Sequence, residues 1–124
     1  MADYFFSKEH EWVRVEGSKG KVGISDHAAH ELGDVTFVEL PKVGARVKQF
    51  EILGSIESVK AASDIFAPVS GAVVAVNTAL ETTPELVNES AEEGAWMAEI
   101  ELSDPSELQN LMTKSQYDDF LKTL

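Results

Sequence analysis

Short apolar runs, separated by glycine and proline, are the feature of this sequence that most limits its fold. No run is longer than a typical β-strand, and several alternate between apolar and polar residues. The runs cover residues 10–15, 21–24, 34–40, 43–47, 52–58, 64–67, 72–77 and 96–102. Because no long helical patterns alternate with them, they predict a mainly β protein, a sandwich or flattened barrel rather than βαβ units.

Helical signals are confined to short segments. Ser25 is expected to cap a short helix that Gly33 ends. A C-terminal helical segment is predicted over about residues 104–124, where Ser115 and Asp118 resemble a capping box for the last helix.

Length and charge limit the possible partners. The chain has 124 residues and a net charge of −12, which repels phosphate backbones and anionic lipids, so neither nucleic acid nor a membrane surface is expected to bind. No linker divides residues 1–124, which predicts a single domain. The sequence shows no secretory or transit signal, so we expect a cytoplasmic protein, or a matrix protein if a mitochondrial presequence was removed.

Catalytic motifs are missing from the sequence. It has no cysteine, no nucleophile elbow and no phosphate-binding glycine loop, so an enzyme is not expected. His27 and His30 are spaced one helical turn apart and could bind a metal ion if His10 or Glu11 approached them. A short exposed helix with incidental histidines is the simpler interpretation.

Lys60 is the remaining candidate for chemistry. It lies among small residues at a predicted hairpin corner, residues 59–62. Glu57 and Asp64 on either side favour the charged amine, which argues against imine catalysis. The residues alone leave two alternatives open, a presented lysine for covalent modification and an ordinary surface lysine.

The sequence around Lys60 resembles the lipoate-attachment hairpin of lipoyl carrier domains, and nearly the whole chain is similar to the H protein of the glycine cleavage system. The hairpin resemblance rests on Gly54, Glu57-Ser58-Val59-Lys60-Ala61 and Ala67-Pro68-Val69-Ser70-Gly71. The wider resemblance rests on His10-Glu11-Trp12, Gly23-Ile24-Ser25-Asp26-His27-Ala28, Leu32-Gly33-Asp34-Val35, Phe37-Val38-Glu39-Leu40-Pro41, Val76-Asn77, the segment from Pro84 to Asn88 and Gly94-Ala95-Trp96-Met97. In the last of these, Ala95 separates the glycine and tryptophan of a GWM-like element.

The resemblance implies a carrier rather than a catalyst. It implies a flattened barrel-sandwich hybrid of the lipoyl/biotinyl carrier type, with lipoic acid in amide linkage to Lys60. The lipoyl arm would carry an aminomethyl group from a pyridoxal-phosphate glycine decarboxylase to a tetrahydrofolate-dependent aminomethyltransferase, and a flavin-dependent dihydrolipoamide dehydrogenase would reoxidise it. A lipoylating enzyme is a further implied partner, and a monomer suffices for such docking.

The resemblance also implies roles for side chains around the arm. Recognition of the attachment site would involve the residues next to the lysine and a nearby carboxylate, namely Glu57, Ser58, Val59, Ala61 and Asp64. Polar groups at Glu9, Glu11 and Asp64 would shield the amine of the loaded arm, because an amine is stabilised by nearby carboxylates.

Three related interpretations compete with this one. Lipoyl domains of 2-oxo-acid dehydrogenases usually have aspartate before the lysine and lie beside alanine/proline-rich linkers, whereas Val59 precedes Lys60 and no linker is present. A biotin carrier would place methionines beside the lysine, where Val59 and Ala61 stand. An H-like lipoyl donor or relay protein without glycine cleavage activity stays open.

Overall fold

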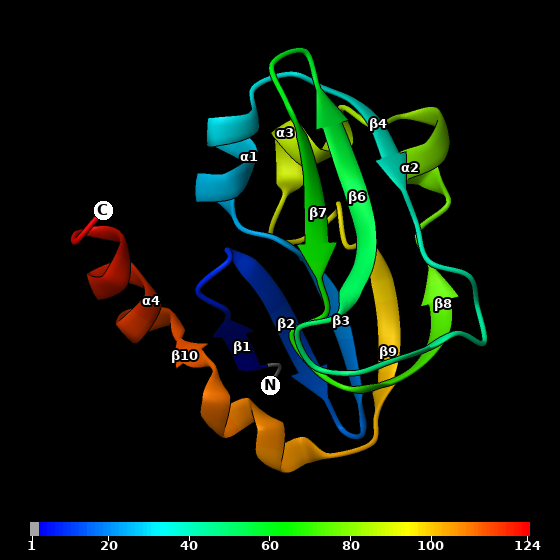
Figure 1. The fold of residues 1–124 in the computed structure, drawn as a ribbon, viewed down its shortest axis with the longest axis vertical. Coiled ribbons are helices and arrows are strands. Elements are labelled where there is room, and N and C mark those ends of the chain that lie inside the picture. The colour runs from blue at the N-terminus through cyan, green and yellow to red at the C-terminus, as the bar shows by residue number, and fades with distance from the viewer. Residues whose placement is uncertain (1–2) are drawn as a thin grey trace.

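The computed structural model describes residues 3–124, which form two antiparallel sheets with short helices between and after the strands (Figure 1). The larger sheet has the order β10 (Met112–Thr113), β1 (Asp3–Phe6), β2 (Glu11–Glu16), β3 (Lys19–Ile24), β9 (Ala98–Leu102), β8 (Gly71–Val76) and β5 (Arg46–Val47). The smaller sheet has the order β4 (Val35–Glu39), β6 (Ile52–Ser58) and β7 (Ala62–Phe66). Neither sheet closes into a barrel, and the predicted flattened, mainly β fold is confirmed.

Short helices connect and follow the strands. They are α1 (Asp26–Leu32), α2 (Ala79–Thr82), α3 (Leu86–Ser90), the 3₁₀ helix η1 (Pro105–Asn110) and α4 (Lys114–Leu121). Within residues 3–124, no helix combines the length and the apolar character needed to cross a membrane.

Helix α1 begins and ends as the sequence predicts. The Ser25 hydroxyl accepts a hydrogen bond from the Ala28 N–H at 3.2 Å and so caps the first turn. Gly33 ends the helix with φ of +74° and ψ of −152°, a backbone conformation that is essentially restricted to glycine. The helix is thereby confined to the seven residues between these two signals.

The C-terminal segment differs from its prediction in two ways. The capping box of α4 is formed by Thr113 and Gln116, not by Ser115 and Asp118, because the Thr113 side chain accepts from the Gln116 N–H and the Gln116 side chain accepts from the Thr113 N–H. The preceding helix is a 3₁₀ helix that stops at Asn110, because Leu111 is extended and turns into the core.

Strand β1 was not predicted from the sequence. Its four residues are too few to establish an alternating pattern, and three of them are aromatic. It forms because β2 pairs with one of its edges and β10 with the other. One of these two partners, β10, lies more than 100 residues further along the chain.

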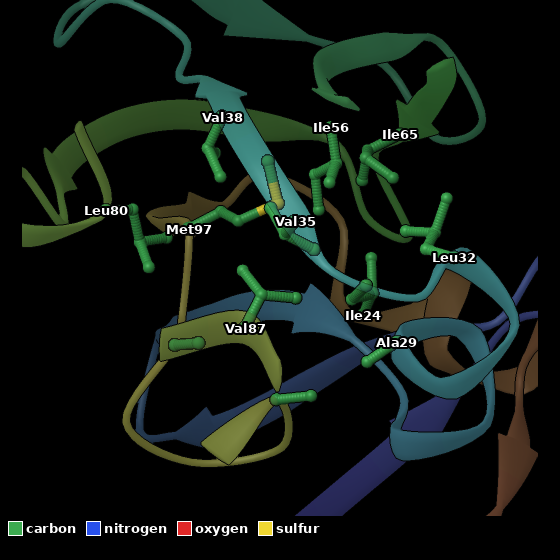
Figure 2. Close-up of a cluster of buried hydrophobic side chains, with 12 residues drawn as sticks. Ile24, Ala29, Leu32, Val35, Val38, Ile56, Ile65, Leu80, Val87 and Met97 are labelled. Atoms are coloured by element: carbon green, nitrogen blue, oxygen red, sulfur yellow. The ribbon is translucent and has the colours of Figure 1, made fainter. Parts of the chain in front are cut away.

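A buried cluster lies under the smaller sheet and joins it to the helices. Figure 2 shows Val38, Ile56 and Ile65 from β4, β6 and β7 pointing toward side chains of α1, α2 and α3. Its members are Ile24, Ala29, Leu32, Val35, Val38, Ile56, Ile65, Leu80, Val87, Ala91, Ala95 and Met97. Burial of these side chains, each of the larger ones contributing roughly 1.5–3 kcal/mol, anchors the base of the β6–β7 hairpin.

Candidate functional site

The β6–β7 hairpin extends to one end of the molecule, where Lys60 lies in the connection between the two strands (Figure 1). The Ser58 N–H donates to the Ala61 carbonyl at 2.8 Å. The Ser58 hydroxyl accepts from the N–H groups of Lys60 at 3.2 Å and Ala61 at 3.1 Å. One serine therefore holds the turn that presents the exposed lysine.

The tip is also held by the segment between α1 and β4. The Val59 N–H donates to the Asp34 carbonyl at 3.0 Å. The Lys60 side chain lies against Gly33, since a Cβ on that glycine would be 2.7 Å from Lys60 Cε. A side chain at residue 33 would compete with the lysine for this space.

The expected recognition residues lie around the tip as exposed or half-buried side chains. Val59 is 68% exposed, and Ala61 and Glu57 are also exposed. Asp64 is exposed on β7, two residues beyond the partner of Glu57. Among residues 3–124, neither carboxylate lies within salt-bridge distance of the Lys60 amine.

A groove of about 440 Å³ runs along the flank of the hairpin. It is lined by the turn before β2, by α1 and by β7, and its ionisable residues are Glu9, His10, His27, Glu31 and Asp64. The structure therefore brings Glu9 and Asp64, which are far apart in sequence, to one groove beside the lysine-bearing hairpin. Its acidic groups suit a cationic or amine-bearing occupant.

Glu11 does not line this groove. It is 1% exposed, and its carboxylate accepts hydrogen bonds from the Ser7 hydroxyl and from the Phe66 N–H at 3.2 Å. Burial raises the pKa of the Glu11 carboxyl above its ordinary value, while the bonds from Ser7 and Phe66 act in the opposite direction. Glu11 thus ties β2 to β7, and a direct role toward an arm stays a prediction.

His10 connects the groove to the C-terminal helix. Its Nδ1 lies 2.7 Å from the Tyr117 hydroxyl, which is also 2.7 Å from the Ser25 hydroxyl. Burial lowers the pKa of His10, the nearby His27 ring lowers it further, and Glu9 and Glu31 oppose both effects. Burial raises the pKa of Tyr117 to about 12, so its hydroxyl stays protonated and able to donate.

His27 and His30 are the candidate metal ligands in the sequence. The ring centroids of His10 and His27 are 4.7 Å apart, whereas His30 is exposed in the last turn of α1 and does not line the groove. Within residues 3–124, no three histidine, aspartate or glutamate side chains are grouped to hold a metal ion. The arrangement offers no support for the metal-dependent alternative.

Sequence reasoning did not identify every residue that shapes the site. Tyr117 was not singled out, and Asn88 and Gly33 were named only within motifs that carry the family resemblance or, for Gly33, as the end of a helix. Tyr117 carries no signal beyond its place in an amphipathic helix, and Asn88 is exposed in a helix of five residues. Only the tertiary contacts of these side chains relate them to the hairpin.

The fold and the site define a small β protein that presents an exposed lysine at the end of a hairpin whose turn is held by hydrogen bonds. The family described as "Glycine cleavage H-protein" matches residues 4–124. The glycine cleavage system H protein of Bacillus licheniformis is 56% identical over 117 residues, covering 94% of this chain and 92% of that protein. That of Koribacter versatilis is 55% identical over 119 residues, covering 96% and 91%.

A solved structure shows the same relationship in three dimensions. The crystal structure of a glycine cleavage system H protein from Mycobacterium marinum superposes with a TM-score of 0.88 at 32% identity, covering 97% of each chain. The chain belongs to the glycine cleavage H-protein family. The resemblance noted from its motifs is thereby confirmed.

Proposed function

We propose that this chain is the lipoyl carrier protein of a glycine cleavage system, with lipoic acid joined to Lys60 by an amide bond. The observation that carries the proposal is the exposed Lys60 at the tip of a hairpin whose turn is fixed by hydrogen bonds. Membership of the H-protein family supports the choice of reaction system. The chain then acts as a carrier subunit rather than as a catalyst.

The surroundings of Lys60 suit attachment of a flexible arm. Ala61, Ala62 and Ser63 are small and exposed, which leaves room for a lipoylating enzyme. Exposed Glu57 and Val59, with Ser58 fixing the turn, form the surface that such an enzyme would recognise. Attachment needs accessibility and shape more than intrinsic reactivity of the amine, and the exposure of Lys60 supports it.

As a carrier, the protein would move its lipoyl arm between several partner enzymes. It is expected to dock with a pyridoxal-phosphate glycine decarboxylase, a tetrahydrofolate-dependent aminomethyltransferase and an FAD-containing dihydrolipoamide dehydrogenase. When bound, lipoic acid supplies the sulfur chemistry for aminomethyl transfer and redox cycling, which a chain without cysteine lacks. The protein supplies a rigid base from which the arm reaches each partner, and the groove beside the hairpin can receive the arm between visits.

A lipoyl donor or relay without glycine cleavage activity would use the same lysine. Family membership favours the full glycine cleavage role. We also propose that residues 1–124 act as one carrier domain, which is supported by a buried cluster joining the smaller sheet to the rest of the chain. A monomeric state and a cytoplasmic location stay predictions.

Peptide masses test the attachment directly. The protein is produced in cells that synthesise lipoate and is then digested with trypsin. Unmodified chain is cut after Lys48 and Lys60 and releases peptide 49–60. Modification blocks the second cut, so the expected product spans residues 49–114 and is heavier by one lipoyl group. Complete cutting at an unmodified Lys60 would contradict the proposal.

Glu9 and Asp64 are expected to protect the amine of the loaded arm, because both line the groove. We predict that a Glu9→Gln/Asp64→Asn double variant loses its aminomethyl amine about tenfold faster, since hydrogen bonds to charged groups contribute roughly 1.5–3 kcal/mol and exposure weakens them. The measurement is the rate of ammonia or labelled one-carbon release from purified loaded carrier.

The matched control for this prediction is Glu39→Gln. Glu39 is also exposed on the smaller sheet and lies in register with Ser55, whose other neighbour is Asp64. It does not line the groove, so its loss should leave the release rate unchanged. Equal rates for all three proteins would show that the groove carboxylates do not protect the arm.

A further inference from the structure

The side chain of Asn88, on α3, bridges the segment that joins α1 to β4. Its Nδ2 donates to the Gly33 carbonyl at 2.7 Å, and its Oδ1 accepts from the Val35 N–H at 2.9 Å. Only one orientation of the amide satisfies both bonds, because a carbonyl needs a donor and an N–H needs an acceptor. One asparagine therefore closes both ends of a three-residue segment.

That segment contacts two neighbouring residues at the tip of the hairpin, Val59 and Lys60. The carbonyl of its middle residue, Asp34, accepts from the Val59 N–H at 3.0 Å. Its first residue, Gly33, lies under the Lys60 side chain, as the 2.7 Å between Lys60 Cε and a Cβ built there shows. A shift of this segment would therefore change the contacts that hold Val59 and the Lys60 side chain.

The strand pairing beside the tip is interrupted, so the Gly33–Val35 segment depends more on its hydrogen bonds to Asn88. The register of β4 with β6 shifts between Val35 and Phe37, so the regular ladder breaks just before the segment reaches the tip. The Val35 N–H is bonded to Asn88 at this break. The Ser58 hydroxyl bonds only groups within the turn, and beyond this break β6 meets β4 at the pair Val35 and Ser58.

We infer that Asn88 is a positioning residue for modification of Lys60, acting through the Gly33–Val35 segment. The inference rests on the proposed function, in which Lys60 receives the lipoyl group. Without the Asn88 side-chain amide, the hairpin tip samples more conformations. The conformation that a ligase recognises is then less populated, and the ligase binds the carrier more weakly in the same proportion. Once bound, the lysine reacts as before.

The test is lipoate transfer by a lipoate–protein ligase supplied with ATP and lipoate, followed by intact mass at several carrier concentrations. For Asn88→Ala we expect KM for the carrier to rise about threefold to tenfold with kcat nearly unchanged. Asn88→Asp, which has nearly the same shape but no donor for the Gly33 carbonyl, should also raise KM. Asn88 is exposed, so neither variant opens a cavity.

Asn77→Ala is the matched control. Asn77 also bridges backbone segments, since its Nδ2 donates to the Gly94 carbonyl at 3.0 Å, but it makes no bond to the Gly33–Val35 segment. Amide hydrogen exchange at Val59 supplies a readout independent of the ligase, and it should accelerate in Asn88→Ala and not in Asn77→Ala.

The outcomes separate the two proposals. A raised KM with faster Val59 exchange in the Asn88 variants alone supports the inference. Unchanged KM and exchange in Asn88→Ala, or an equal rise of KM in Asn77→Ala, overturns it while a modified wild-type Lys60 leaves the carrier proposal intact. Failure of the wild-type protein to be modified at Lys60 overturns the carrier proposal, and this inference with it.

Discussion

Replacing Lys60 with arginine is expected to abolish lipoyl attachment and, with it, the protein's activity as a carrier. Arginine keeps the positive charge, but its guanidinium remains protonated and does not form the lipoyl amide. Because Lys60 is exposed and forms no salt bridge within residues 3–124, the free energy of unfolding should change by less than about 0.5 kcal/mol. The measurements are intact mass and glycine decarboxylation reconstituted with the three partner enzymes proposed above.

Lys42→Arg provides the matched control for this experiment. Lys42 is an exposed lysine in the loop between β4 and β5, away from the hairpin tip. This variant should gain the lipoyl mass and support decarboxylation at the wild-type rate. Continued turnover by the Lys60→Arg protein would show that the one-carbon unit is not carried at Lys60.

Among the substitutions proposed here, Trp12→Ala is expected to lower the free energy of unfolding the most. Trp12 is fully buried, and replacing a buried tryptophan by alanine typically costs about 3–5 kcal/mol. Its indole N–H also bonds the carbonyls of Ile24 at 2.7 Å and Ala91 at 3.0 Å, just before α1 and just after α3. The variant should therefore lose much of a typical domain stability of about 5–15 kcal/mol, measured by chemical denaturation.

Trp96→Ala is the control that separates this position from a general effect of losing tryptophan. Trp96 is only half-buried, and Lys21 Nζ lies 5.0 Å from its ring centroid. We expect a clearly smaller loss of stability for this variant. Similar losses for the two variants would mean that the buried hydrogen bonds and packing of Trp12 are not decisive.

The strands and the first helix could be predicted because their signals are local. Short apolar runs mark the positions of β2 and β6, and Ser25 with Gly33 marks both ends of α1. The C-terminal cap was wrong for the opposite reason. Thr113 and Ser115 are both plausible caps in sequence, and pairing of β10 with β1 makes Thr113 the extended residue that precedes the helix.

The candidate site also has one part that local sequence predicts and another that it does not. Lys60 was identified from its neighbours in sequence, because the attachment motif and the turn are continuous there. The groove was not foreseen as a structure, since Glu9 and Asp64 are joined only by packing of β7 against the turn before β2. Burial of Glu11 was likewise unforeseen, because a carboxylate in sequence gives no sign that Ser7 and the Phe66 N–H will satisfy it.

The sequence by itself determined the mainly β class, the carrier family and the lysine that the hairpin presents, because each depends on residues that are adjacent or regularly spaced. Tertiary structure alone decided how that lysine is held. Gly33 and Asp34 meet the tip, and Asn88 bonds the Gly33 carbonyl, only after α3 and α1 pack on the smaller sheet. Such contacts arise from burial and hydrogen-bond satisfaction across long stretches of chain, and no local pattern encodes them.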